Sequence, residues 1–128
     1  MHKIHNPPTA VAPFGRYAQG VEAAKDLRWL FVAGQVGVTP DGKTGESFEA
    51  QARAAFANVK AILEAAGMGF EDVVKLQIFL TSIDDAPVYR QVREEFMGDV
   101  TVASTLLVVA GLARPEWRIE VEAVAAKA

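Results

Sequence analysis

The sequence contains no cysteine, which excludes disulfide bonds, thiolate nucleophiles and cysteine-ligated zinc. It also lacks any run of Lys and Arg, and its formal net charge is −3, so nothing predicts a nucleic-acid surface. The longest apolar run, 106–110, is far too short to span a bilayer, and residues 1–8 lack the apolar core of a signal peptide. We therefore expect a cytoplasmic protein whose partners include neither a membrane nor a nucleic acid.

Two further kinds of site are missing, a metal site and a phosphate-binding loop. If His2 and His5 lay on a helix, their spacing would suit a metal ion. However, Pro7 and Pro8 follow, and no pattern in this segment predicts a helix. No glycine-rich run leads into a helix with Lys followed by Ser or Thr, which a phosphate-binding loop requires. We therefore expect no metal site.

The length of 128 residues suits a single domain, taken here as residues 1–128. Residues 1–12 are rich in proline and are expected to be extended or poorly ordered. The apolar pattern and the turn residues predict strands at 17–23, 28–35, 73–81, 104–109 and 117–125, and helices at 47–66 and 84–96.

The ends of both helices can be predicted from capping chemistry. Ser47 is expected to cap the first helix, and Gly67 to supply the left-handed residue beyond its end, with Met68 folding back onto the last turn. Asp84 or Asp85 is expected to cap the second helix. An apolar stripe at helical spacing supports the first helix, formed by Phe48, Ala52, Phe56, Val59 and Leu63.

The strands and helices predict a sheet with one uncovered face. Strand–helix–strand connections are right-handed, which places both helices on the same face. In the strand 73–81 one face is predicted to carry Val74, Leu76, Ile78 and Leu80. The other is predicted to carry Val73 and Phe79 with Lys75 and Gln77. Because residues 106–109 are apolar on both faces, the second face is too apolar to remain in water, and another copy of the chain is expected to cover it.

Two acidic residues near the C-terminus are candidates for chemistry. Glu120 and Glu122 alternate with apolar residues, so both carboxylates leave one face of the predicted strand, and Arg118 is expected to share that face. One interpretation is a solvated strand face with an ion pair. The other is a carboxylate in a cleft, whose pKa is raised by desolvation and by its like-charged neighbour, as suits a general acid or base. The residues alone leave both interpretations open.

Four short patches between Pro13 and Ala125 form one recognisable set: Gly-Arg-Tyr-Ala-Gln at 15–19, Ala-Gly-Gln at 33–35, Asp-Val-Val-Lys at 72–75 with Ile-Phe-Leu at 78–80, and Ile-Glu-Val-Glu-Ala at 119–123. In this set the chain resembles the Rid (YjgF, "L-PSP endoribonuclease") family of small trimeric enamine/imine deaminases. The resemblance implies an α+β, chorismate-mutase-like domain, with a mixed sheet and two helices on one face. It also implies a homotrimer with three clefts between subunits that take a small-molecule metabolite and need no cofactor.

The resemblance assigns roles to several residues. Glu120 matches the family glutamate that orients the attacking water, whereas Glu122 matches an acid that is more often structural. Tyr17 would line the cleft and contact the substrate, although by itself it reads as an amphipathic packing residue. Gly34 would present backbone groups to the ligand, or mark a bulge or close backbone approach. Gln35 is either a ligand contact or a structural amide.

The resemblance also has a gap. Where family members with deaminase activity carry Pro-Ala-Arg-Ser, this chain has Val-Ala-Ser-Thr at 102–105, so Ser104 replaces the arginine that grips the substrate carboxylate. A hydroxyl cannot bind a carboxylate through two charged hydrogen bonds as an arginine does. The loss of those two bonds would weaken transition-state binding of a carboxylate substrate by on the order of 10²-fold or more. One explanation is a changed substrate, with Ser104 shaping that end of the cleft. A second is another arginine that reaches the carboxylate, with the candidates Arg16, Arg90, Arg114 and Arg118. A third is a cleft that binds without turnover.

We therefore expect a hydrolytic deaminase of a small enamine or imine at a cleft between subunits, with a substrate other than 2-aminoacrylate. Glu120 and Tyr17 are the predicted catalytic residues, and the predicted substrate-binding residues are Gly34, Gln35, Ser104, Arg90 and Arg114. The main alternative is a non-catalytic trimer that binds a metabolite and regulates a partner. A ribonuclease is disfavoured, because the acidic chain shows no patch of basic and aromatic residues for single-stranded RNA.

Overall fold

The computed structural model describes residues 2–128. A two-stranded ribbon is formed by β1 (Lys3–His5) and β2 (Gly20–Glu22). The main sheet contains β3 (Arg28–Val36), β4 (Val73–Leu80), β5 (Ala103–Val108) and β6 (Ile119–Lys127). Two helices, α1 (Phe48–Ala65) and α2 (Ala86–Met97), and two short 3₁₀ turns, η1 (Phe70–Asp72) and η2 (Ile83–Asp85), complete the chain.

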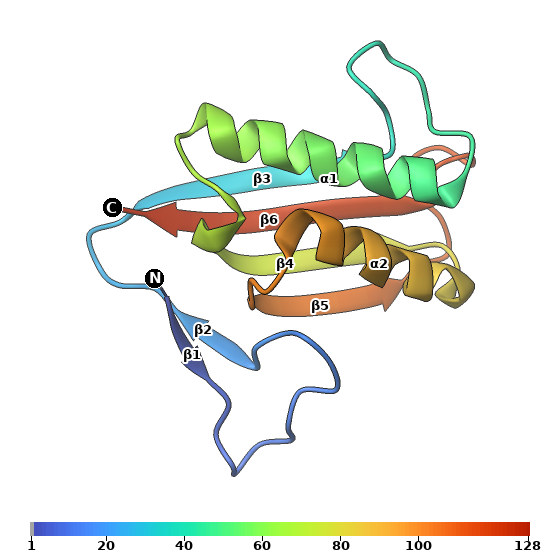
Figure 1. Ribbon diagram of the computed structural model, residues 1–128. Helices are drawn as coiled ribbons and strands as arrows, with labels where there is room; N and C mark the ends of the chain where they lie inside the picture. Colours follow the sequence, from blue (N-terminus) through green and yellow to red (C-terminus); the bar gives the residue numbers. More distant parts are fainter. Residues whose placement is uncertain (1) are drawn as a thin grey trace.

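The main sheet is mixed and has the strand order β3-β6-β4-β5. β4 pairs with β5 in parallel, whereas β6 is antiparallel to both β3 and β4. Both helices lie on one face of this sheet, and the β1–β2 ribbon projects beyond the β5 edge (Figure 1). These features confirm the predicted α+β class, the mixed sheet and the single helix-covered face.

The N-terminal segment is more regular than the sequence predicts. Residues 3–5 pair with β2, so part of the segment expected to be extended or poorly ordered is a strand; Met1 lies outside the described residues. The strand expected at 17–23 is shorter than predicted, because it covers only Gly20–Glu22, which pairs with β1. Ahead of it, Ala18 forms a single parallel bridge with Ala103, which ties the segment to the β5 edge.

The predicted ends of α1 are confirmed. The Ser47 side chain accepts a hydrogen bond from the backbone N–H of Ala50 at 3.0 Å. Gly67 has a φ of +70°, and the N–H of Met68 returns to the Leu63 carbonyl at 2.9 Å, which closes the end of the helix.

The predicted N-cap position of α2 is confirmed at Asp85, but the expected capping hydrogen bond is not formed. The Asp85 carboxylate instead accepts two hydrogen bonds from the Arg118 guanidinium, at 2.8 and 3.0 Å. A two-pronged bond to a charged donor is stronger than a bond to a backbone N–H, which explains why the ion pair replaces the cap.

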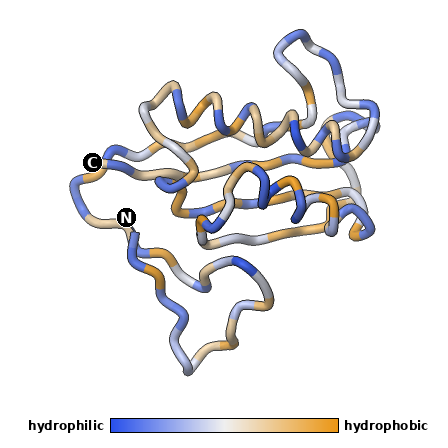
Figure 2. Tube along the Cα trace, viewed as in Figure 1, coloured by the Kyte–Doolittle hydropathy of each residue, from blue (hydrophilic) through white to orange (hydrophobic). Residues whose placement is uncertain are grey.

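The helix-covered face holds the core. Phe56 is fully buried, and its ring centroid lies 5.6 to 6.3 Å from those of Phe70, Tyr89 and Phe96. The strands carry most of the apolar residues beneath the helices, while the tip of the loop between β3 and α1 is hydrophilic (Figure 2).

One detail of the predicted strand faces is wrong. Val73 is buried with the core, whereas Val74 is only half-buried. The register of β4 against β6 shifts between Val73 and Lys75, so a bulge at this point exchanges the faces of the first two residues. From Leu76 onward the predicted alternation holds.

The opposite face of the sheet has no helix over it. Phe31 is 74% exposed, and Trp29 and Leu107 are also exposed on this side. Around them lie the half-buried polar residues Lys75 and Gln77 of β4 and Glu122 of β6. We call this surface the open face. Separately, no helix within residues 2–128 is long and apolar enough to cross a membrane.

Candidate functional site

Five of the predicted site residues, Tyr17, Arg90, Ser104, Gly34 and Glu120, lie in two separate groups, the first of which also contains residues that were not predicted. The first lines a pocket of about 440 Å³ between α2, β5 and the segment 14–17. We call this group the tyrosine half-site, and its members are Tyr17, Tyr89, Arg90, Arg93 and Ser104. The second group, Gly34 and Glu120, is called the glutamate half-site.

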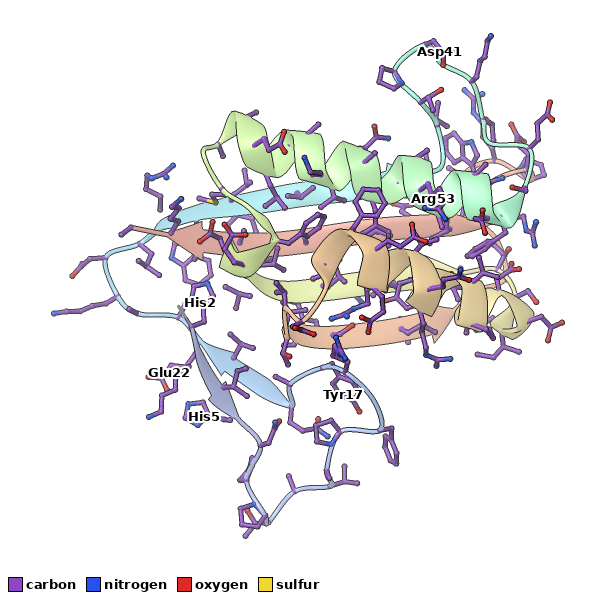
Figure 3. The ribbon with its side chains drawn as sticks, viewed as in Figure 1. His2, His5, Tyr17, Glu22, Asp41 and Arg53 are labelled. Atoms are coloured by element: carbon purple, nitrogen blue, oxygen red, sulfur yellow. The ribbon has the colours of Figure 1, made fainter. Side chains whose placement is uncertain are left out.

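Backbone contacts hold Tyr17 against the β5 edge. The N–H of Ala18 donates to the Val102 carbonyl at 2.8 Å, and Tyr17 lies on the β1–β2 loop beside this edge (Figure 3). The Tyr17 hydroxyl accepts a hydrogen bond from the N–H of Phe14 at 3.1 Å. Its own proton therefore remains available to a ligand or water in the pocket.

Arg16 fixes the same segment to the end of α2. Its guanidinium donates to Glu94 at 3.1 Å, to Asp99 at 2.9 Å and to the Gly98 carbonyl at 3.0 Å. These partners compensate its charge, so Arg16 serves to position Tyr17 and is not free to grip a substrate.

Ser104 lies at the base of the tyrosine half-site. It pairs with the core residue Leu76 on β4 and so faces the helix side of the sheet. Burial raises the pKa of Tyr89 to about 12, against the opposing effects of the Arg93 charge and of a hydrogen bond with Ser104. Tyr89 is thus neutral at ordinary pH, and Ser104 and Arg93 converge on its hydroxyl.

In the glutamate half-site, Gly34 lies directly against the Glu120 side chain. The register of β3 against β6 shifts between Val32 and Gln35, so Gly34 is in a bulge. A Cβ at position 34 would lie 1.9 Å from Oε2 of Glu120 and 2.7 Å from its Cδ. The interpretation of Gly34 as a bulge is therefore confirmed, whereas the expected close approach of backbone is instead that of a side chain, and glycine makes room for the carboxylate.

The two half-sites cannot meet within one chain. Glu120 pairs with Phe79 on β4 and shares the open face with it, whereas Ser104 faces the helices. The strand β4 also separates β6 from β5, which is about 10 Å between the two strands. The glutamate half-site is half-buried on the open face, the tyrosine half-site lies at the β5 edge on the helix side, and each lacks the chemical groups that the other carries.

The remaining predicted residues lie elsewhere. The Gln35 side chain donates to the Ala33 carbonyl at 3.0 Å, as a structural amide would. Arg114 lies over the Trp117 ring, 5.2 Å from its centroid, in the loop that follows the far end of β5 from Ser104. The expectation that Arg118 shares a face with Glu120 is wrong. Its guanidinium reaches the helix layer, where it contacts Asp85 and the Phe48 ring.

Two residues of the tyrosine half-site, Tyr89 and Arg93, were not predicted from the sequence. Both lie on the buried side of α2, and Arg93 is only 5% exposed. The signal was present, because Ala86, Tyr89, Arg93 and Met97 follow one another at helical spacing. An arginine within an otherwise buried stripe is unusual enough to mark a site.

Each of the two histidines contacts a different partner. His2 donates to the Asp72 carbonyl at 3.0 Å, and His5 contacts Glu22 at 2.6 Å across the β1–β2 ribbon (Figure 3). No group of three or more potential metal ligands occurs within residues 2–128.

Comparison with known proteins identifies the family. The family model described as Endoribonuclease L-PSP matches residues 7–127. A RutC family protein of Aquifex aeolicus is 37% identical over 122 residues, which cover 94% of this chain and 95% of that protein. A 2-iminobutanoate/2-iminopropanoate deaminase of Dermatophagoides farinae is 33% identical over 125 residues, covering 95% and 94%. The structure of YyfB, a protein of unknown function of the Rid family from Yersinia pestis, superposes with a TM-score of 0.83 at 29% identity, covering 97% of each chain. The chain therefore belongs to the Rid (YjgF, endoribonuclease L-PSP) family, which includes proteins named as deaminases of reactive imines.

Proposed function

We propose that the protein is a hydrolytic deaminase of a small enamine or imine, and that its active site forms where two copies of the chain meet. The observation that carries the proposal is the separation of the half-sites. A carboxylate with a glycine-lined space beside it lies on one face, and a pocket with a tyrosine and arginines lies at another edge. A neighbouring copy can bring the glutamate half-site of one chain to the tyrosine half-site of the next.

The chemistry needs few groups. An enamine tautomerises to an imine, and water then adds across the C=N bond. Glu120 accepts a proton from the water as its oxygen bonds to the imine carbon, and a proton passes to the nitrogen. The resulting carbinolamine collapses to a C=O group and releases ammonia, so that imine and water give carbonyl compound and ammonia. Holding water and imine together supplies much of the rate.

The open face supports assembly through copies of the same chain. Phe31, Trp29 and Leu107 expose large apolar side chains that a partner would remove from water, at about 25 cal/mol per Å². The polar residues among them include Lys75, which donates to Thr105 at 2.6 Å. The resemblance to the family favours a trimer with three equivalent clefts.

The size of Ser104 favours a substrate other than 2-aminoacrylate. The small side chain leaves space at the end of the pocket where the family resemblance places an arginine. A three-carbon substrate would not fill that space, so a longer or differently shaped imine fits better.

The proposal is tested with a matched pair of variants on one strand. Glu120→Gln removes the proposed water-activating carboxylate, and Glu122→Gln removes an equal charge from the same strand face two residues away. We expect Glu120→Gln to slow ammonia release from enzymatically generated imines by about 10²–10⁴-fold, as the loss of a general base does. Glu122→Gln should retain activity within several-fold.

Two other results would count against the proposal. If the wild-type protein left the lifetime of a panel of acidic and neutral imines unchanged, the deaminase assignment would be wrong. If small metabolites raised the melting temperature without any turnover, the metabolite-binding alternative would replace it.

A further inference from the structure

The tyrosine half-site contains more positive charge than its own residues compensate. Its pocket is lined by Arg16, Arg90 and Arg93, against a single carboxylate, that of Glu94. Glu94 is already paired with Arg16, which also bonds to Asp99. Two guanidinium groups, those of Arg90 and Arg93, therefore remain without an acidic partner at the pocket.

Arg93 is the more informative of the two. Its side chain is 5% exposed, and it donates to the Val100 carbonyl at 3.2 Å and approaches the Tyr89 hydroxyl. No carboxylate within residues 2–128 lies within ion-pair distance of it. Burying a charge without a counter-charge is costly, and an anionic ligand in the pocket would supply the missing counter-charge.

Arg90 is exposed one residue beyond Tyr89, at the mouth of the same pocket. It makes no ion pair or side-chain hydrogen bond with any residue that the structure describes. The neighbouring hydroxyl groups of Ser104, Tyr89 and Tyr17 can donate hydrogen bonds but carry no negative charge, since burial keeps Tyr89 neutral. Every polar side chain that lines the pocket, apart from that of the paired Glu94, therefore favours an anion.

We propose that Arg93 and Arg90 of α2 bind the carboxylate of the substrate, and that they determine specificity for imines of carboxylic acids. The inference rests on the proposed function and names its substrate class. Ser104, which replaces the family arginine, lines the same pocket as Tyr89 and Arg93. Because the Ser104 side chain is small, a substrate carboxylate can pass β5 and reach the guanidinium of Arg93 on α2. This guanidinium lies deeper in the pocket than an arginine on β5 would, which matches the longer substrate proposed above.

The test compares a carboxylic acid with its neutral amide. Binding of 2-oxobutanoate and of 2-oxobutanamide is measured by titration calorimetry, and KM and kcat are measured for an imino acid and for the matching imino amide. We expect the wild-type protein to bind the acid at least 10-fold more tightly than the amide. Arg90→Gln should weaken acid binding by about 10-fold, because one charged donor is lost, and should leave amide binding unchanged.

Two variants of the buried position separate charge from structure. Arg93→Lys keeps the charge and should retain part of the preference for the acid, whereas Arg93→Met should abolish it. Arg53→Gln is the matched control, because Arg53 pairs with Glu95 on the outer helix surface (Figure 3) and its loss should leave the ratio unchanged. If Arg93→Met does not fold, Arg90→Gln and Arg93→Lys still decide the question.

The outcomes distinguish this inference from the proposed function. Equal binding of acid and amide by the wild-type protein would overturn the inference, as would an acid preference that is undiminished in both Arg90→Gln and Arg93→Lys. Hydrolysis of neutral imines with exclusion of acids would overturn the inference and leave the deaminase function intact. An acid preference that depends on Arg90 and Arg93, without hydrolysis of any imine, would support the inference and refute the function.

Discussion

A methyl group added at Gly34 should inactivate the protein without unfolding it. The Cβ of Gly34→Ala would lie 1.9 Å from Oε2 of Glu120, whereas ordinary contact begins at 3.4 Å. The carboxylate must therefore move by about 1.5 Å, and it can do so, because Oε2 is the far end of a flexible and half-buried side chain.

We expect Gly34→Ala to lower the catalytic rate and to leave the stability of the fold nearly unchanged. Misplacing a reacting group by about 1 Å costs on the order of 10²-fold in rate, so kcat should fall by about 100-fold, equivalent to about 2.7 kcal/mol. The free energy of unfolding should change by less than about 1 kcal/mol, because Gly34 does not have a positive φ and alanine also lowers the entropy of the unfolded chain.

The assay is steady-state ammonia release from an enzymatically generated imine, together with urea unfolding followed by circular dichroism. Gly20→Ala is the matched control, because its Cβ would make only ordinary contacts, at 3.7 Å from His5. Wild-type kcat in Gly34→Ala would refute the reasoning, since the position of the Glu120 carboxylate would then be irrelevant to the rate.

Three further predictions follow from the core, the open face and the surface charges. Phe56→Ala should lower the free energy of unfolding by about 3–5 kcal/mol in urea titrations, because Phe56 is fully buried among three aromatic rings. Phe31→Glu should dissociate the oligomer in sedimentation velocity while the chain stays folded, since Phe31 is 74% exposed in the single chain; an unchanged sedimentation coefficient would exclude this face as the interface. The hydrogen bond from Arg53 lowers the pKa of Glu95 below its ordinary value of 4.5. Ionised Glu95 thus contributes stability that is present above about pH 4.5 and is lost as the pH falls through the folded-state pKa, so Glu95→Gln should weaken the acid dependence of urea unfolding.

Most of the fold followed from local patterns in the sequence. The apolar stripe of 47–66, with Ser47 and Gly67 at its ends, predicted α1 closely because capping and periodicity agree there. The errors arose where tertiary contacts override local chemistry. Asp85 has good capping chemistry, but Arg118, 33 residues later, competes for its carboxylate. The bulge at the start of β4 depends on pairing with β6, which no local pattern encodes.

The candidate site was predictable only in part, for a similar reason. Glu120, Tyr17 and Gly34 were proposed from the sequence because each lies in a short patch with a recognisable pattern, and Ser104 because it replaces an arginine of such a pattern. Arg93 and Tyr89 were missed, because their importance comes from where α2 packs against β5. The alternation of side chains along a predicted strand placed Arg118 on the same face as Glu120. Arg118 in fact lies before β6 begins, and its side chain reaches the helix layer.

The most direct test of the shared active site is complementation between two inactive variants. One chain carries Tyr17→Phe with Arg90→Gln, which disables the tyrosine half-site, and the other carries Glu120→Gln, which disables the glutamate half-site. The two are purified as mixed oligomers through different affinity tags. If each site uses one half from each of two chains, one of the three sites in every mixed trimer combines two intact halves, so the mixed oligomers recover about a third of the wild-type activity. Mixed oligomers that are no more active than their parents would contradict the account, because the half-sites would then have to act within a single chain.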